Sequence, residues 1–187
     1  MRLLHWRGCY TEQDPVLPLA AAEVRGGLLA AAGFAQRRDA WLREREPRTH
    51  SNMKGYLWVH AYAEHAETSD QAQEAMAALG RFGGMPSHRP LTATNYSIGR
   101  TLLLAGKTEE AVGYLRKAAH ACMPLSAPVR YVRANLFLGQ ALEATGDKAG
   151  ACKAYDVVLA RWGKAKPRSV TAEEARRRSK ALGCTAP

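Results

Sequence analysis

Two histidines and a glutamate stand close together between positions 60 and 65, and these residue types bind zinc in many hydrolases. Zinc-hydrolase helices carry two histidines four residues apart, so that both imidazole rings lie on one face. Here His60 and His65 are five residues apart, which separates them by about 140° around a helix. One metal ion could hardly contact both rings. We therefore expect no metal site, and expect His60, Glu64 and His65 to face solvent or to form local hydrogen bonds.

The tripeptide Gly106-Lys107-Thr108 ends like the phosphate-binding loop of nucleotide-binding proteins. That loop also needs a glycine five residues before the glycine of the tripeptide, but position 101 is a threonine. The apolar residues 102–104 would in addition have to leave a helix core in order to surround a phosphate. We interpret the tripeptide as a turn between two helices and expect no nucleotide cofactor.

A histidine and a cysteine, the pair that acts in thiol hydrolases, lie two residues apart at His120 and Cys122. Residues with this spacing point to different sides of a helix, so a catalytic pair would need a histidine from elsewhere in the chain. The sequence contains neither paired carboxylates nor a Ser-His-Asp arrangement that suggests catalysis. We therefore expect that the protein is not an enzyme and needs no cofactor.

The cysteines are widely scattered along the 187 residues, at positions 9, 122, 152 and 184. No two of them have the C-x-x-C spacing of zinc or redox sites. Disulfide frameworks are typical of smaller, cysteine-rich chains, so we expect reduced and mostly buried thiols. The N-terminal segment lacks the apolar stretch of a secretory signal, and no apolar run approaches the roughly 18–20 residues of a membrane span. These observations favour a cytoplasmic protein without membrane contact.

Basic residues predominate, giving a net charge of +10, and the segment 161–180 contains eight basic and two acidic residues. A nucleic-acid interface would combine such charge with aromatic side chains that stack on bases, but only Trp162 lies nearby. Three explanations of the charge stay open: a solvated capping helix, an acidic protein partner, or nucleic acid. The candidate basic patch consists of Arg176, Arg177, Arg178 and Lys180.

One pattern of small and apolar residues occurs twice, beginning at Asn95 and again at Asn135. In each copy a glycine follows an aliphatic residue, a second glycine comes seven residues later, and an alanine follows after five more. Small residues let helix backbones approach closely, and the second glycine is typical of a helix end. The pattern therefore predicts stacked pairs of antiparallel helices. Its positions are Gly99, Gly106 and Ala111 in the first copy, and Gly139, Gly146 and Ala151 in the second.

Four helix pairs and one final helix follow from this spacing and from the signals that start and end helices. Thr68 and Gln71 have capping-box spacing, as do Thr171 and Glu174, and Gly183 is expected to close the last helix. The predicted elements are a divergent pair over 16–46, broken at Gly33, a weak pair over 52–82, clear pairs over 92–122 and 132–162, and a capping helix over 171–182.

The pattern resembles the tetratricopeptide repeat (TPR), which has an aliphatic-Gly pair on its first helix, a Gly-containing turn, and an Ala-x-x-x-aromatic stretch on its second helix. The resemblance covers residues 95–160, is weaker over 52–82, and is absent before residue 50. The period is 39–40 residues, against about 34 in the family. The resemblance implies an all-α, right-handed solenoid of antiparallel helix pairs with a C-terminal capping helix. The length of the chain predicts a single domain over residues 1–187.

The segment from about residue 56 to residue 184 also resembles the C-terminal repeat arrays of some bacterial serine/threonine protein kinases. It contains no glycine-rich loop, H-R-D or D-F-G motif. If this kinship holds, the chain corresponds to the sensing or docking part of such a kinase without the catalytic part.

The TPR resemblance implies a binding groove lined by the first helix of each pair. Tyr96 and Arg100 stand where a TPR clamp for a C-terminal carboxylate has Lys and Asn, so that ligand is not implied. We expect a scaffold that binds a protein or peptide segment through apolar anchors and mixed polar contacts; the alternative is a basic nucleic-acid-associated or transcription-regulator accessory domain. The groove residues, which can instead simply pack against the next helix, are Tyr96, Arg100, Leu103, Leu136, Gln140 and Glu143.

Overall fold

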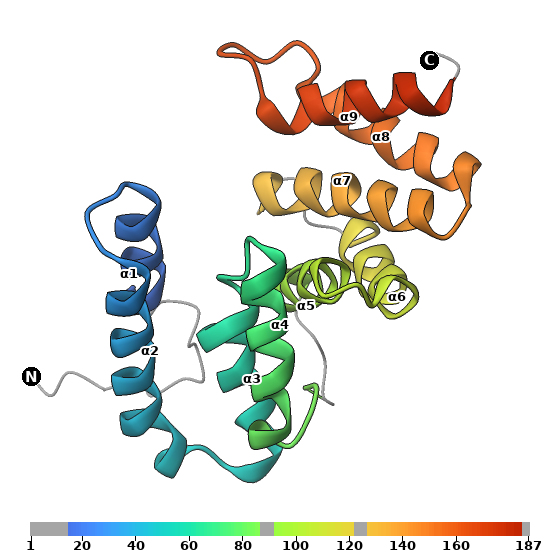
Figure 1. Cartoon of the computed structure of the whole chain (residues 1–187). Helices are drawn as coiled ribbons and strands as arrows, with labels where there is room; N and C mark the ends of the chain where they lie inside the picture. The colour runs from blue at the N-terminus through green and yellow to red at the C-terminus, as the bar shows by residue number, and fades with distance from the viewer. Residues whose placement is uncertain (1–14, 87–91, 122–126, 185–187) are drawn as a thin grey trace, which may run out of the picture. The chain divides into compact units, whose positions relative to one another are not determined.

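The computed structural model describes residues 15–86, 92–121 and 127–184, and over these residues the chain forms helices joined by turns, without strands. The predicted all-α class is therefore confirmed. Contacts between residues divide the chain into two compact units, residues 1–51 and residues 52–187. The helices of both units are labelled in Figure 1. The divergent N-terminal pair thus forms a unit of its own, and its membership of one continuous array stays a prediction.

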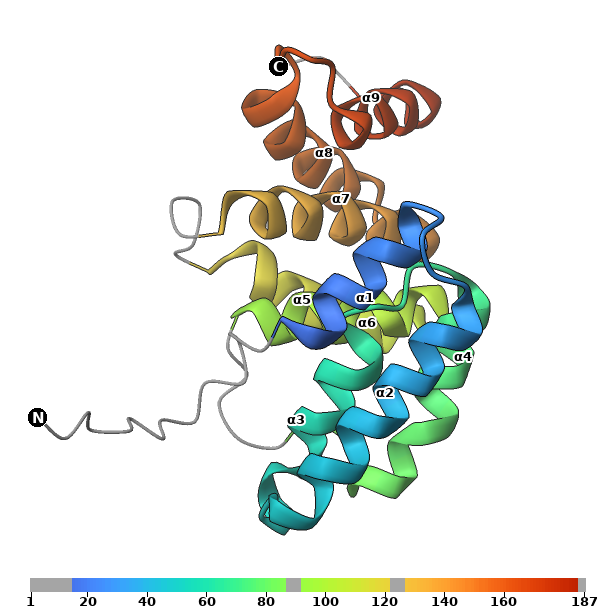
Figure 2. The same cartoon turned by 90° about the vertical axis from the view of Figure 1, so that its left-hand side faces the viewer.

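The first unit contains α1 (Val16–Arg25), α2 (Ala31–Arg45) and the short 3-10 helix η2 (Glu46–Arg48), and α1 packs against α2 (Figure 2). The expected break at Gly33 is wrong, because Gly33 lies inside α2. The chain turns instead at residues 26–30, where Gly27 has a φ of +71°, which favours glycine. A Cβ at Gly33 would lie 2.4 Å from Leu29 Cδ1, the end of a half-buried side chain.

The second unit begins with the weak helix pair predicted over 52–82. After η3 (Ser51–Met53), its first helix is α3 (Lys54–Trp58), extended by a π-helical turn η4 (Val59–Ala63); its second is α4 (Ser69–Ala78), extended by η5 (Leu79–Phe82). The predicted capping box is confirmed, because the Thr68 and Gln71 side chains each accept a hydrogen bond from the other residue's main-chain N–H. The buried Trp58 indole donates to the Ala75 carbonyl over 2.6 Å and joins the two helices.

The two clear repeats form α5 (Thr92–Leu104) with α6 (Thr108–Ala119), and α7 (Pro128–Ala144) with α8 (Lys148–Trp162). Gly106 and Gly146 end the first helix of each pair with φ values of +82° and +83°, as helix-terminating glycines do. A Cβ on Gly99 would lie 2.7 Å from Leu115 Cγ, and one on Gly139 would lie 2.3 Å from a Tyr155 ring carbon. These glycines therefore allow the close approach that the repeat predicts.

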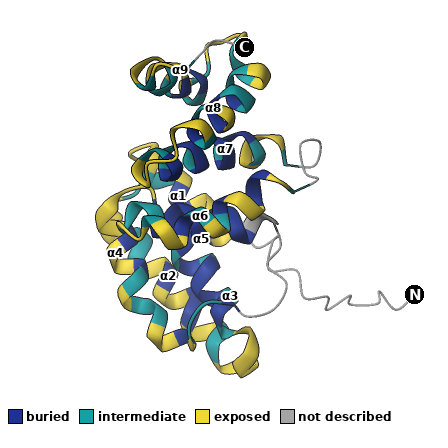
Figure 3. Cartoon of the chain, turned by 90° about the vertical axis from the view of Figure 1, so that its right-hand side faces the viewer, coloured by how far each residue is buried: buried dark blue, intermediate teal, exposed yellow. Residues whose placement is uncertain are grey.

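Each helix from α5 to α9 packs against the next one along the chain, and smaller contacts join α5 to α7 and α7 to α9. Buried residues are concentrated in α5 and α7, whereas much of α9 is exposed (Figure 3). Within the described part of the chain, no helix has the length and apolar character needed to cross a membrane.

The final helix, α9 (Val170–Leu182), ends at Gly183, whose φ is +62°, as predicted. Its start differs from the prediction, because the N-cap is Ser169, whose side chain accepts a hydrogen bond from the Ala172 N–H. Thr171 lies inside the helix, and Glu174 binds arginines instead of closing a capping box. Only small residues of α9, Ala172 and Ala175, are buried.

A disulfide between Cys152 on α8 and Cys184 after α9 corrects the expectation of reduced thiols for these two residues. Their Cα atoms are 5.6 Å apart. The bond closes a segment that begins on α8 and includes all of α9, so it ties the capping helix covalently to the helix on which it packs. Cys9 and Cys122 lie outside the described residues.

Candidate functional site

Five side chains from three successive parts of the second unit meet in one cluster of arginines and aromatic rings. Glu67 follows η4, Tyr96 and Arg100 lie on α5, and Arg133 and Phe137 lie on α7. On each of these two helices the pair is spaced by four residues, which places both side chains on one helix face. We call these five residues the arginine–aromatic cluster.

Arg100 is the buried centre of the cluster, with 2% of its surface exposed. Its Nη1 donates to Glu67 Oε1 over 2.9 Å, and its Nη2 donates to the carbonyls of Glu64 (2.9 Å) and Ala63 (3.3 Å). These carbonyls end η4, where a helix leaves acceptors unpaired and favours a cation. The guanidinium is thus committed to contacts within the chain.

Arg133 meets the same carboxylate from the other side, donating from Nη2 to Glu67 Oε2 over 3.3 Å. Its guanidinium carbon lies 5.8 Å from the centre of the Tyr96 ring and 5.9 Å from that of Phe137. The two rings are 6.1 Å apart. Such distances support cation–π attraction. The side chain of Arg133 is 34% exposed and that of Glu67 38% exposed, so this part of the cluster reaches solvent.

The predicted groove residues are distributed differently from the expectation. Tyr96, Arg100 and Leu136 are buried, and the first two meet through a hydrogen bond of 3.4 Å from Arg100 Nη1 to the Tyr96 hydroxyl. Leu103 and Gln140 are half-buried. The expectation that Arg100 faces a partner is therefore corrected, because its guanidinium is enclosed by α5 and the end of η4.

Reasoning from the sequence missed Glu67, Arg133 and Phe137. The spacing of four between Arg133 and Phe137 on the first helix of a clear repeat was an available signal. Arg133 lies before the start of the aligned pattern at Asn135, however, so comparison of the two copies did not single it out.

Burial and nearby charges shift the pKa values of two groups in and beside the cluster. Burial raises the pKa of Tyr96, against the opposing effect of the Arg100 and Arg133 charges, so the phenol stays protonated. Burial also acts to raise the pKa of Glu64, but the His60 hydrogen bond and the nearby positive charges prevail and lower it. His60 Nδ1 and Glu64 Oε2 are 3.1 Å apart, which is the local hydrogen bond expected for this segment. Among the described residues, no group of three or more His, Cys, Asp or Glu side chains is placed to hold a metal ion.

Glu143, the sixth predicted groove residue, belongs to a second cluster that joins three helices. Its Oε2 accepts from the Tyr155 hydroxyl over 2.7 Å and from Arg178 Nη1 over 3.1 Å. Arg178 also donates from Nε to Glu174 Oε1 over 2.6 Å. Burial, followed by the contact with Glu143, raises the pKa of Tyr155. Glu143 therefore docks α9 against α7 and α8.

The predicted basic patch is largely paired with acidic residues of its own helix. Arg176 binds Glu173 over 2.9 Å and the Gly163 carbonyl over 3.0 Å. Arg177 donates two hydrogen bonds to Glu174, which Arg178 also contacts. Lys180 is exposed on the same helix. This pairing favours a solvated capping helix as the explanation of these arginines.

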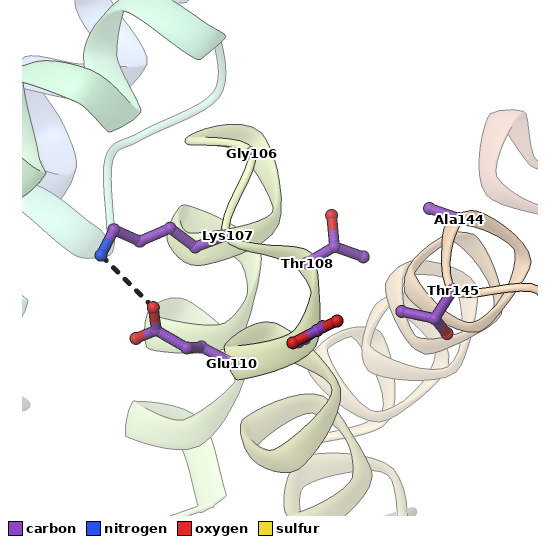
Figure 4. A pocket seen from close by; sticks show the side chains of 7 residues that line it. Gly106, Lys107, Thr108, Glu110, Ala144 and Thr145 are labelled. Carbon is purple, nitrogen blue, oxygen red and sulfur yellow. Dashed lines mark hydrogen bonds and ion pairs between the residues drawn. The ribbon is translucent and has the colours of Figure 1, made fainter.

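An open depression of about 570 Å³ lies where the turn of the first clear pair faces the end of α7 (Figure 4). Lys107 Nζ binds Glu110 Oε1 over 3.3 Å, and Glu109 also lines the depression. Two carboxylates beside one paired lysine oppose phosphate binding. Gly106 is the turn expected from the repeat.

Comparisons with protein-family models, with curated proteins and with solved structures find no match to this chain.

Proposed function

We propose that residues 52–184 form a non-catalytic protein-interaction module with the architecture of a TPR array, a right-handed solenoid of three helix pairs closed by α9. Support comes from the sequential packing of α5 to α9, from the glycine turns at equivalent positions, and from the capping role of Glu143 and Arg178. A link to protein kinases rests on the sequence resemblance alone.

The observation that carries the proposal is the arginine–aromatic cluster, because it joins side chains of α5 and α7, the first helices of two successive pairs, to Glu67 in the turn of the pair before them. Aromatic and arginine side chains are enriched among the residues that dominate binding energy in protein interfaces. Phe137 is half-buried and Arg133 remains partly exposed. A peptide or helix that lies across α5 and α7 would place an apolar side chain on the Phe137 ring.

Replacement of one ring tests this assignment. Peptides selected for binding to the full chain from a random peptide library should lose about tenfold or more in affinity for Phe137→Ala. Tyr114→Ala, on the second helix of its pair, is the matched control and should change affinity less than about twofold. Equal effects of the two substitutions, measured by calorimetric titration, would exclude the cluster as the binding face.

One feature favours nucleic acid as a second candidate, although the paired arginines of α9 do not. The end of α8 and the connection to α9 carry four exposed basic residues close to the half-buried Trp162. Their attraction to phosphates would depend steeply on salt. Micromolar binding of a mixed-sequence single-stranded oligonucleotide that weakens steeply with salt would favour this candidate, and absence of binding at physiological salt would exclude it. The four residues are Arg161, Lys164, Lys166 and Arg168.

A further inference from the structure

The two arginines that share Glu67 differ in how far their hydrogen-bonding capacity is used. Arg100 has 2% of its surface exposed and donates from two nitrogens to Glu67 and to the main-chain carbonyls at the end of η4. Arg133 has a side chain that is 34% exposed, and among the described residues it donates a single bond, to Glu67. Arg100 is therefore the fixed element of the cluster, and Arg133 is the accessible one.

We infer that Arg133 is the recognition residue for an acidic side chain of a protein partner, and that Glu67 occupies Arg133 as an internal stand-in until the partner binds. This inference rests on the proposed function and names the chemistry of the partner at the same face. It goes further because it assigns separate roles to the two arginines and a competing role to Glu67.

Carboxylate geometry supports this assignment. A guanidinium offers a planar fork that binds both oxygens of a carboxylate, and such paired bonds are stronger than a single one. Arg133 contacts only Oε2 of Glu67, whose Oε1 accepts from Arg100 over 2.9 Å. A partner carboxylate can offer both oxygens, so exchange of the ligand on Arg133 is favourable. Glu67 retains Arg100 after the exchange.

The residues around Arg133 favour a ligand that has one carboxylate next to apolar side chains. The half-buried Phe137 ring, 5.9 Å from the guanidinium carbon, provides an apolar contact surface, and the buried Tyr96 ring, 5.8 Å from it, restricts the arginine side chain. Glu64 and Glu67 lie in the segment that faces α5, and they oppose the evenly spaced charges of a nucleic-acid backbone. The favoured occupant is therefore an acidic peptide with an apolar or aromatic residue close to its carboxylate.

Binding of a random copolymer of glutamate and tyrosine to the full chain, followed by fluorescence anisotropy, tests the inference. Arg133→Gln should weaken binding about tenfold, as expected for the loss of a charge-assisted pair. Glu67→Gln should strengthen binding about threefold, because the competing charge is removed, even though it weakens a contact within the fold. Arg116→Gln removes the same charge from the exposed side of α6 and should change binding by less than about twofold. A lysine–tyrosine copolymer should not bind.

A second variant distinguishes the loss of recognition from misfolding. Arg133→Lys keeps the positive charge but loses the planar fork, so its affinity for the copolymer should lie between those of the wild type and Arg133→Gln. Equal losses for Arg133→Gln and Arg116→Gln would overturn the inference in favour of general charge attraction, and so would weaker or unchanged binding of Glu67→Gln. Binding that requires Phe137 but not Arg133 would overturn the inference and leave the proposed face intact. A single-stranded oligonucleotide that binds through Arg133 and displaces the copolymer would overturn the choice of a protein partner.

Discussion

On α5 the Arg100 guanidinium donates from Nη2 to the main-chain carbonyl of Glu64, with an N–O distance of 2.9 Å. The carbonyl belongs to the end of η4, so this bond joins the first helix of one pair to the first helix of the next. Thr101 adds a bond from its hydroxyl to the Ala63 carbonyl over 3.2 Å. The junction between these two pairs is therefore polar and buried.

Loss of this buried cation should destabilise the fold more than loss of a surface arginine. Arg100→Met removes four acceptor contacts and leaves Glu67, the Tyr96 hydroxyl and two carbonyls without this donor, so we expect a loss of about 2–4 kcal/mol in the free energy of unfolding. Arg116→Met, on the exposed side of α6, should cost less than about 0.5 kcal/mol. Urea unfolding followed by circular dichroism compares the two. Similar values would mean that the Arg100 contacts do not stabilise the fold.

Replacing a helical glycine by alanine should lower the stability of the protein at one position and raise it at another. Gly139→Ala would place a Cβ 2.3 Å from the Tyr155 ring, and the forced separation of α7 and α8 should cost about 1–3 kcal/mol. Gly113 lies on α6 with no atom within 4 Å of the corresponding Cβ position. Gly113→Ala should therefore stabilise by about 0.5–1 kcal/mol through helix propensity. Thermal melting of both variants checks the sign, and two shifts in the same direction would contradict the packing described for Gly139.

Reduction of the disulfide should lower the stability of the region around α9. The cysteines are separated by 32 residues, for which loop-closure entropy predicts about 3–4 kcal/mol. Melting with and without a dithiol reductant measures the change. The double variant Cys152→Ser, Cys184→Ser is the control, because its melting should not respond to the reductant.

The Cys152–Cys184 disulfide is also related to the cellular compartment of the protein. Disulfides persist mainly in oxidising environments, whereas the sequence favoured the cytoplasm. Alkylation of thiols in protein taken rapidly from its native cells should leave Cys152 and Cys184 unlabelled. Full labelling of both residues would support the cytoplasmic expectation and show that the bond does not form there.

Stability should depend on pH through Glu64, whose pKa lies below its ordinary value of 4.5 in the folded chain. The folded state then binds fewer protons than the unfolded chain, so the contribution is present above about pH 4.5 and is lost as the pH falls through the folded pKa. Urea unfolding at pH 6 should show Glu64→Gln less stable than the wild type, and the difference should shrink towards pH 3. A difference that is constant over this range would exclude the ionised carboxylate of Glu64 as its source.

Much of the local structure was predictable because its causes are local. The glycine turns at Gly106 and Gly146 follow from a backbone conformation that glycine adopts readily, and the Thr68–Gln71 box follows from two residues three apart. Two local predictions were wrong because neighbouring residues could start or end a helix equally well. Gly33 carries no positive φ and lies in a helix, while Ser169, two residues before Thr171, supplied the cap of α9.

Residue order and periodicity alone determine the helical class, the helix pairs of the second unit, and the small residues through which paired helices approach. These features depend on hydrogen bonds and side-chain positions within about one turn of helix. The contact between Glu67 and Arg133 joins residues 66 positions apart, and the disulfide joins residues 32 apart. Such meetings arise only when whole helices have packed, because packing decides which side chains are enclosed and which charges must pair. For that reason Arg100, which was expected to face a partner, is buried and links α5 to the end of η4 by hydrogen bonds. Arg133 beside it is the accessible arginine of the cluster.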